Sequence, residues 1–138
     1  MTPKMASMNA RPGQLRDARC YPRYRTRLPV TITFPNGEST TVYSGMISMR
    51  GMELDCDKKT TQYALGKDLP SPPILPHSIR FSIELPAEPS IIINGMLKLL
   101  NSRRVAESHY VLGAEYQHLK KADLDQLASF LEEFTPVP

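Results

Sequence analysis

Three arginines at alternate positions stand out as side chains able to bind a ligand: Arg23, Arg25 and Arg27 directly precede a Leu-Pro-Val segment. A guanidinium group presents two parallel N–H donors, which match guanine O6 and N7 or two phosphate oxygens in a way that lysine does not. Such a cluster of guanidinium groups favours an anionic ligand. Pro29 limits Leu28 to extended conformations, which would fix the exit of this segment into a strand.

A serine and a glycine about twenty residues later have complementary properties. Ser48 offers a small hydroxyl donor and acceptor, and Gly51 permits a tight backbone turn beside a ligand. Taken alone, both residues are more typical of ordinary turns, and clustered arginines are more typical of a solvated surface. The assignment of Ser48 and Gly51 to a binding site therefore depends on the arginines.

The sequence lacks the residues that metal binding, cofactor binding or common enzymatic reactions would require. Cys20 and Cys56 match no zinc-ligand spacing, and His77, His109 and His118 have no paired carboxylate at a useful spacing. The sequence contains no phosphate-binding loop, dinucleotide fingerprint or serine-nucleophile motif. We therefore expect no metal site, no cofactor and no enzymatic activity.

Positive charge is concentrated at the start of the chain. The 138 residues carry a net charge of +3, but residues 1–27 hold seven basic side chains against one acidic side chain, and the remainder is slightly acidic. This asymmetry favours an anionic partner near the N-terminal segment. We expect a flexible basic arm at 1–20 and a single domain at 21–138. Because no apolar run is long enough for a membrane span or a signal core, the sequence predicts a cytoplasmic protein.

Alternating apolar residues predict six short strands. The period of two appears at residues 30–34, 39–43, 51–56, 79–85, 91–100 and 110–116. Cys56 alternates in phase with its apolar neighbours, so it should be buried. Asn36 and Gly37 predict a two-residue hairpin turn, because both tolerate positive φ. Gly95 indicates a bulge or a close backbone approach within the fifth strand.

The period changes to about 3.6 residues near the end of the chain. Leu124, Leu127, Leu131 and Phe134 predict a helix over 122–134 whose apolar stripe packs on the strands. Asp123 and Asp125 are expected in its first turn, where they would complement the helix dipole.

The long connection at 57–78 ends in a proline-rich run at 70–76, and this run is expected to be extended. Six strands followed by one C-terminal α-helix predict an all-β fold, a six-stranded antiparallel β-barrel that is closed or nearly closed.

Three segments resemble the motifs of the PilZ domain family. Residues 23–30 read Arg-Tyr-Arg-Thr-Arg-Leu-Pro-Val, similar to the family's Arg-x-x-x-Arg loop leading into an x-Pro-Val strand. Residues 46–51 read Met-Ile-Ser-Met-Arg-Gly, similar to its [Asp/Asn]-x-Ser-x-x-Gly motif. Residues 112–116 read Leu-Gly-Ala-Glu-Tyr, similar to the strand before its C-terminal helix. The resemblance covers about residues 19–134 and implies a PilZ-like split barrel.

The resemblance also implies a ligand, cyclic di-GMP, a bacterial second messenger with two guanines and two phosphates. Its motifs assign four residues to the ligand, namely Arg23, Arg27, Ser48 and Gly51. Three further positions are weaker candidates, namely Arg19, Arg25 and Met46.

Met46 departs from the family pattern, which has Asp or Asn at this position to accept hydrogen bonds from the donor edge of guanine. A thioether is a poor acceptor, and the loss would cost on the order of 1–3 kcal/mol. The hydroxyl of Ser44 or a carbonyl near Gly45 would be the alternative acceptor.

Three functions follow as hypotheses. The first is a cyclic di-GMP receptor whose ligand orders the arm and changes the surface offered to a protein partner. The second is a degenerate PilZ domain that acts as a protein-interaction adaptor without nucleotide, which Met46 favours. The third, a nucleic-acid binder, is disfavoured because the chain has no Trp and only 7% aromatic residues for base stacking.

Overall fold

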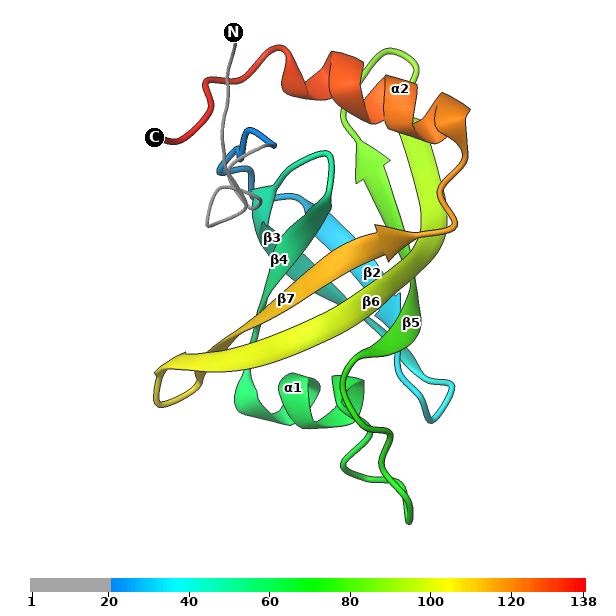
Figure 1. Ribbon diagram of the computed structural model, residues 1–138, viewed down its shortest axis with the longest axis vertical. Helices are drawn as coiled ribbons and strands as arrows, with labels where there is room; N and C mark the ends of the chain where they lie inside the picture. Colours follow the sequence, from blue (N-terminus) through cyan, green and yellow to red (C-terminus); the bar gives the residue numbers. More distant parts are fainter. Residues whose placement is uncertain (1–20) are drawn as a thin grey trace, which may run out of the picture.

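The computed structural model describes residues 21–138, which form a closed β-barrel with two short helices. In chain order the elements are β2 (Pro29–Thr33), β3 (Ser39–Ile47), β4 (Gly51–Cys56), α1 (Lys58–Ala64), β5 (His77–Leu85), β6 (Ile91–Ala106), β7 (His109–Gln117) and α2 (Lys121–Leu131). Around the barrel the strand order is β2-β3-β4-β7-β6-β5, and every neighbouring pair is antiparallel (Figure 1). The predicted six-stranded antiparallel barrel is confirmed. The arm expected at 1–20, with Arg19 and Cys20, lies outside the described residues.

Alternate residues of the strands fill the barrel. On β4, Met52, Leu54 and Cys56 are buried as predicted, while Glu53 and Asp55 between them remain partly exposed on the outside. Burial, followed by the nearby aspartates, raises the pKa of Cys56 to about 12. The thiol therefore stays protonated at neutral pH and is part of the core rather than a nucleophile.

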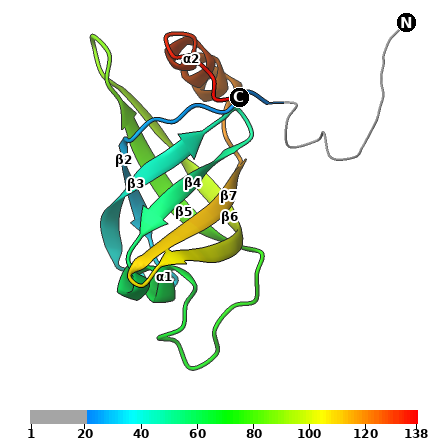
Figure 2. The ribbon, with the colours of Figure 1, turned by 90° about the vertical axis from the view of Figure 1, so that its left-hand side faces the viewer.

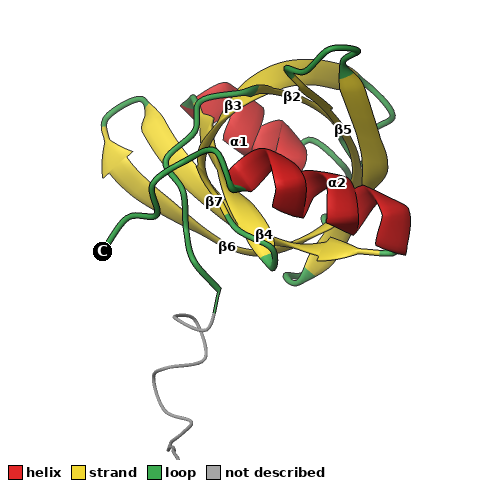
Figure 3. Cartoon of the chain, turned by 90° about the horizontal axis from the view of Figure 1, so that it is seen from above, coloured by secondary structure: helices red, strands yellow, loops and turns green. Residues whose placement is uncertain are grey.

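The two helices lie at opposite ends of the barrel (Figures 1 and 3). Helix α2 crosses one opening and buries Leu127, Phe130 and Leu131. Helix α1 lies at the other end and buries Thr61 and Ala64. Neither helix in the described part of the chain is long and apolar enough to cross a membrane.

Helix α2 ends earlier than predicted. Phe134 lies beyond its last residue, is 38% exposed and contacts the ring of Phe130 at a centroid distance of 5.0 Å. Phe130 takes the buried position instead, because the helix has already ended when the chain reaches Phe134. Asp123 lies in the first turn as expected, but Asp125 does not and instead pairs with Lys121, one turn earlier, at 3.0 Å.

No helix was predicted in the connection at 57–78, but α1 occupies its first part. The carboxylate of Asp57 accepts a hydrogen bond from the backbone N–H of Thr60 at 2.7 Å and caps the helix. Gly66, at φ +74°, adopts the left-handed conformation just after the helix. Residues 21–138 therefore contain two helices instead of one.

Two glycines behave differently from the predictions made for them. The turn between β2 and β3 has three residues, Pro35, Asn36 and Gly37, and only Gly37 has positive φ. The two-residue turn is therefore wrong. Gly95 stays in register opposite Phe81, and an added Cβ would lie 2.5 Å from Leu119 Cδ2. Gly95 therefore makes room for the side chain of Leu119 and not for another backbone, whose nearest atom would lie 3.7 Å from the added Cβ. The predicted bulge is not found there either, because the register shifts of β6 lie further along the strand.

Candidate functional site

The loop before β2 is fixed to the edge of β3 by backbone hydrogen bonds. Tyr24 and Ile47 exchange two N–H···O bonds of 2.8 Å, and Ser44 N–H donates to the carbonyl of Leu28 at 2.9 Å. The Ser44 hydroxyl is fully buried, donates to the carbonyl of Thr26 and accepts from Leu28 N–H. The expectation that Ser44 could replace the missing acceptor at Met46 is therefore wrong, since its hydroxyl is already bonded inside the protein.

This loop directs the two motif arginines to different surroundings. Arg23 is half-buried and lines a hollow on the outer face of the barrel. Arg27 is 67% exposed, lies 4.3 Å from the ring centre of Tyr43 and places a guanidinium nitrogen 3.7 Å from the Asp55 carboxylate. Arg25 is exposed and does not line the hollow. The structure therefore does not bring Arg23 and Arg27 together.

The hollow has a volume of about 280 Å³ and is open to solvent. It extends from Arg23 across β3, β4 and β7 to Leu100 on β6. Of the residues that the sequence assigned to a ligand, Arg23, Met46, Ser48 and Gly51 line it.

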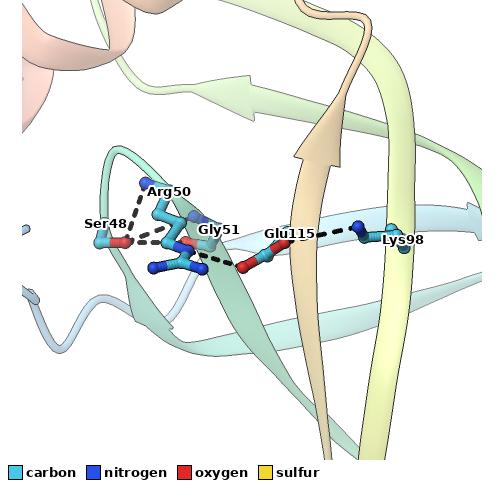
Figure 4. A network of polar contacts seen from close by, with 5 residues as sticks. All are labelled: Ser48, Arg50, Gly51, Lys98 and Glu115. Carbon is cyan, nitrogen blue, oxygen red and sulfur yellow. Dashed lines mark hydrogen bonds and ion pairs between the residues drawn. The ribbon is translucent and has the colours of Figure 1, made fainter. Parts of the chain in front are cut away.

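Ser48 holds the turn between β3 and β4, which forms part of the wall of the hollow (Figure 4). Its hydroxyl accepts from the backbone N–H of Arg50 at 3.1 Å and of Gly51 at 3.3 Å. The phenol of Tyr116 donates to the Ser48 carbonyl at 2.9 Å, and burial raises the pKa of Tyr116 so that it keeps its proton. Ser48 therefore shapes the site through its turn.

Gly51 is required by the packing of two strands. A Cβ at this position would lie 2.0 Å from the carbonyl oxygen of Ala114, on the neighbouring strand β7. The sequence predicted a tight turn beside a ligand, whereas the structure shows close contact between backbones beneath the hollow.

Three charged residues that line the hollow, Arg50, Glu53 and Glu115, were not predicted from the sequence. Glu115 accepts from Arg50 Nε at 2.6 Å and lies 3.8 Å from Lys98 Nζ (Figure 4). Glu53 also lines the hollow, 4.0 Å from Arg103. These side chains come from strands that are neighbours in the barrel but distant in sequence. The pattern that could have identified these strand residues is the alternation along β4, β6 and β7, because they occupy the outward-facing positions.

Other candidate sites among the described residues fit a nucleotide less well. A hollow of about 450 Å³ beside α2 is lined by Glu88, Asp125 and Glu133, whose charges repel an anion. The described residues contain no group of three or more side chains suited to a metal ion. His109 lies 3.3 Å from Asp55, so the prediction that the histidines lack a paired carboxylate is wrong for this one.

Comparison with known proteins gives similarity in structure only. No family model matches the sequence. No curated protein matches it either. Among solved structures, the inhibitor of motility MotI/DgrA of Bacillus subtilis superposes with a TM-score of 0.66 at 19% identity, covering 88% of this chain and 51% of that one. MrkH of K. pneumonia, solved as a complex with c-di-GMP, gives 0.62 at 19% identity, covering 88% and 52%.

The PilZ domain of YcgR from Escherichia coli, solved with c-di-GMP, gives a TM-score of 0.57 at 14% identity, covering 88% of this chain and 92% of that domain. This chain spans about half the length of MotI/DgrA and of MrkH but nearly all of the YcgR domain. The fold of residues 21–138 is therefore that of a PilZ domain.

Proposed function

We propose that the protein is a cyclic di-GMP receptor domain and not an enzyme, and that the hollow beside Arg23 holds one guanine of the ligand. The observation that carries the proposal is the placement of Arg23 in a concave site of about 280 Å³ on a PilZ barrel. Two solved structures with this fold, MrkH and the YcgR domain, contain c-di-GMP. Their similarity to this chain supports the same ligand class here.

The size and charge of the hollow fit part of such a ligand. Sites that enclose a drug-sized molecule measure roughly 300–1,000 Å³. A hollow of about 280 Å³ is therefore suited to one base, with the remainder of the cyclic dinucleotide lying over the rim. Arg23 lines the hollow and would bind the base, while Arg50, which also lines it, would attract a phosphate.

Arg27 would reach the ligand only after leaving its present contacts. Its ion pair with Asp55 is long and its side chain largely exposed. Such pairs contribute roughly 0–1 kcal/mol, and an exposed cation–π contact contributes about as much. Because a phosphate would offer a stronger, bidentate contact, we propose that Arg27 turns from Tyr43 to a phosphate upon binding.

The signal would pass through the segment before the barrel. Residues 1–20 carry four of the seven basic side chains of the N-terminal region and its one acidic side chain. Ligand phosphates would attract this segment, order it across the site and change the surface offered to a protein partner in the cytoplasm.

Calorimetric titration with cyclic di-GMP tests the proposal. Arg23→Ala should weaken binding about 5- to 150-fold, the equivalent of losing one bidentate contact worth ~1–3 kcal/mol. Arg80→Ala is the matched control, because Arg80 is exposed on β5, away from the hollow, and it should bind as the wild type does. No heat from wild-type protein with ligand at about 100 µM, a level suited to weak sites, would overturn the proposal.

A second function is favoured by Met46, whose thioether lines the hollow where the PilZ motif has Asp or Asn. A domain that has lost the nucleotide would act as an adaptor for another protein. It would give no heat in the titration, and it would retain its partner equally with and without added cyclic di-GMP in a pull-down experiment.

A further inference from the structure

We propose that Glu53 is the residue that selects guanine, by accepting hydrogen bonds from its N1–H and 2-amino groups. This inference rests on the proposed function, since it names the group that recognises the base in the same hollow.

The position of Glu53 makes its carboxylate accessible to a base. Glu53 points outward from β4, is 31% exposed and lines the hollow. Its cross-strand neighbours are Met46 on β3 and Gly113 on β7. The thioether of Met46 competes only weakly for hydrogen bonds. Gly113 has no side chain of its own, but the amide of Asn101 lies over it, since an added Cβ would be 2.9 Å from Asn101 Oδ1. A flat ring can therefore lie in the hollow beside this amide, with its edge toward Glu53.

Guanine requires both hydrogen-bond donors and hydrogen-bond acceptors as partners, and the hollow supplies both. Its O6 and N7 are acceptors and suit the guanidinium of Arg23. Its N1–H and 2-amino groups are donors, and leaving them unpaired upon burial would weaken binding. An ionised carboxylate offers two acceptor oxygens and no donor, so it matches this edge with two charge-assisted hydrogen bonds. Adenine, which lacks this pair of adjacent donors, would not match it.

Of the two glutamates in the hollow, Glu53 is the better acceptor. Glu115 already binds Arg50 with one oxygen at 2.6 Å and lies 3.8 Å from Lys98 with the other (Figure 4). Glu53 has a longer ion pair, 4.0 Å from Arg103, whose side chain is 56% exposed. An exposed pair at this distance is weak and screened. The carboxylate of Glu53 can therefore exchange it for the guanine edge.

The test compares cyclic di-GMP with cyclic di-IMP, which lacks the 2-amino group. By calorimetry the wild type should bind cyclic di-GMP about tenfold more tightly, the equivalent of one hydrogen bond to a charged group. Glu53→Gln should weaken cyclic di-GMP about 10- to 100-fold and remove the preference, because the amide offers one acceptor and adds a donor. Thermal melting of both proteins would show that the exposed substitution leaves the fold intact.

Arg103→Gln is the control, because it breaks the same ion pair and leaves the carboxylate in place. It should keep the preference for cyclic di-GMP. If the wild type binds but Glu53→Gln keeps both affinity and preference, or if Arg103→Gln loses the preference equally, the role of Glu53 is refuted while the receptor function stands. If the wild type binds neither nucleotide, the receptor function itself fails.

Discussion

Gly51 lies where β4 passes closest to β7, and its lack of a side chain has a measurable consequence. An added Cβ would meet the carbonyl oxygen of Ala114 at 2.0 Å and its carbon at 2.9 Å. Because these are backbone atoms of a paired strand, they cannot move without disturbing the ladder. Gly51→Ala should therefore lower the free energy of unfolding by about 1–3 kcal/mol, measured by urea denaturation.

Gly45→Ala is the matched control for this prediction. Its added Cβ would lie 3.2 Å from a carboxylate oxygen of Asp55, at the end of a side chain that can rotate. We expect a change below about 0.5 kcal/mol for this variant, as is usual for surface substitutions. Equal stability of the Gly51→Ala and wild-type proteins would contradict the packing role of Gly51.

Some residues of the site were placed correctly by the sequence prediction and others were not, and the difference has a physical reason. Arg23 and Ser48 belong to local motifs, so the sequence identified them and the structure places them in the hollow. The direction of Arg27 depends on Tyr43 and Asp55, which approach it only through the pairing of β3 and β4. A local pattern specifies which residue is present but not which rotamer distant contacts will select.

Among the elements, α1 was missed and all six strands were predicted, although β3 and β6 extend beyond the predicted ranges, to Ile47 and Ala106. The strands have an alternating apolar pattern that follows directly from burial of one face. Helix α1 has seven residues and buries only Thr61 and Ala64, so it lacks the apolar stripe that identifies a helix. Its remaining signals were the N-cap at Asp57 and the glycine at Gly66.

The N-cap of α1 gives a prediction that depends on pH. Hydrogen bonds from Thr60, chiefly from its backbone N–H, lower the pKa of Asp57 below its ordinary value of 3.8. The ionised cap therefore contributes its full stabilisation above pH 3.8 and loses it as the pH falls below the lowered pKa. Asp57→Ala should reduce the free energy of unfolding by about 0.5–2 kcal/mol at pH 7, and by less at pH 2, in urea denaturation.

The variant Asp57→Asn distinguishes the stabilisation that comes from the N-cap hydrogen bond from the stabilisation that comes from the negative charge. Asn is as good an N-cap as Asp and does not titrate, so this variant should be close to wild type at pH 7. A loss in Asp57→Asn as large as that in Asp57→Ala would show that the side chain acts through its charge on neighbouring groups instead of through the cap.

At the scale of the whole molecule, the chain end beyond α2 is connected to the candidate site. The N–H of Val137 donates to the carbonyl of Arg23 at 2.7 Å. Figure 2 shows the C-terminus beside the loop that precedes β2. The same residue thus offers its side chain to the hollow and its carbonyl to the C-terminal segment. The sequence did not predict this link, because Val137 and Arg23 lie at opposite ends of the described chain and share no pattern.

This link predicts that the ligand protects a distant amide from exchange. A ligand that holds the Arg23 side chain restrains its backbone, and we expect this restraint to favour the state in which Val137 is bonded. Since Val137 lies between Pro136 and Pro138, its amide is the only one at 136–138 and can be followed singly by NMR. Saturating cyclic di-GMP should slow its hydrogen exchange about fivefold or more, the lower end of typical coupling energies. The amide of Gly37, in the turn between β2 and β3, should exchange equally fast with and without ligand. Unchanged exchange at Val137 in a protein that calorimetry shows to be saturated would mean that the C-terminal segment is not coupled to the site.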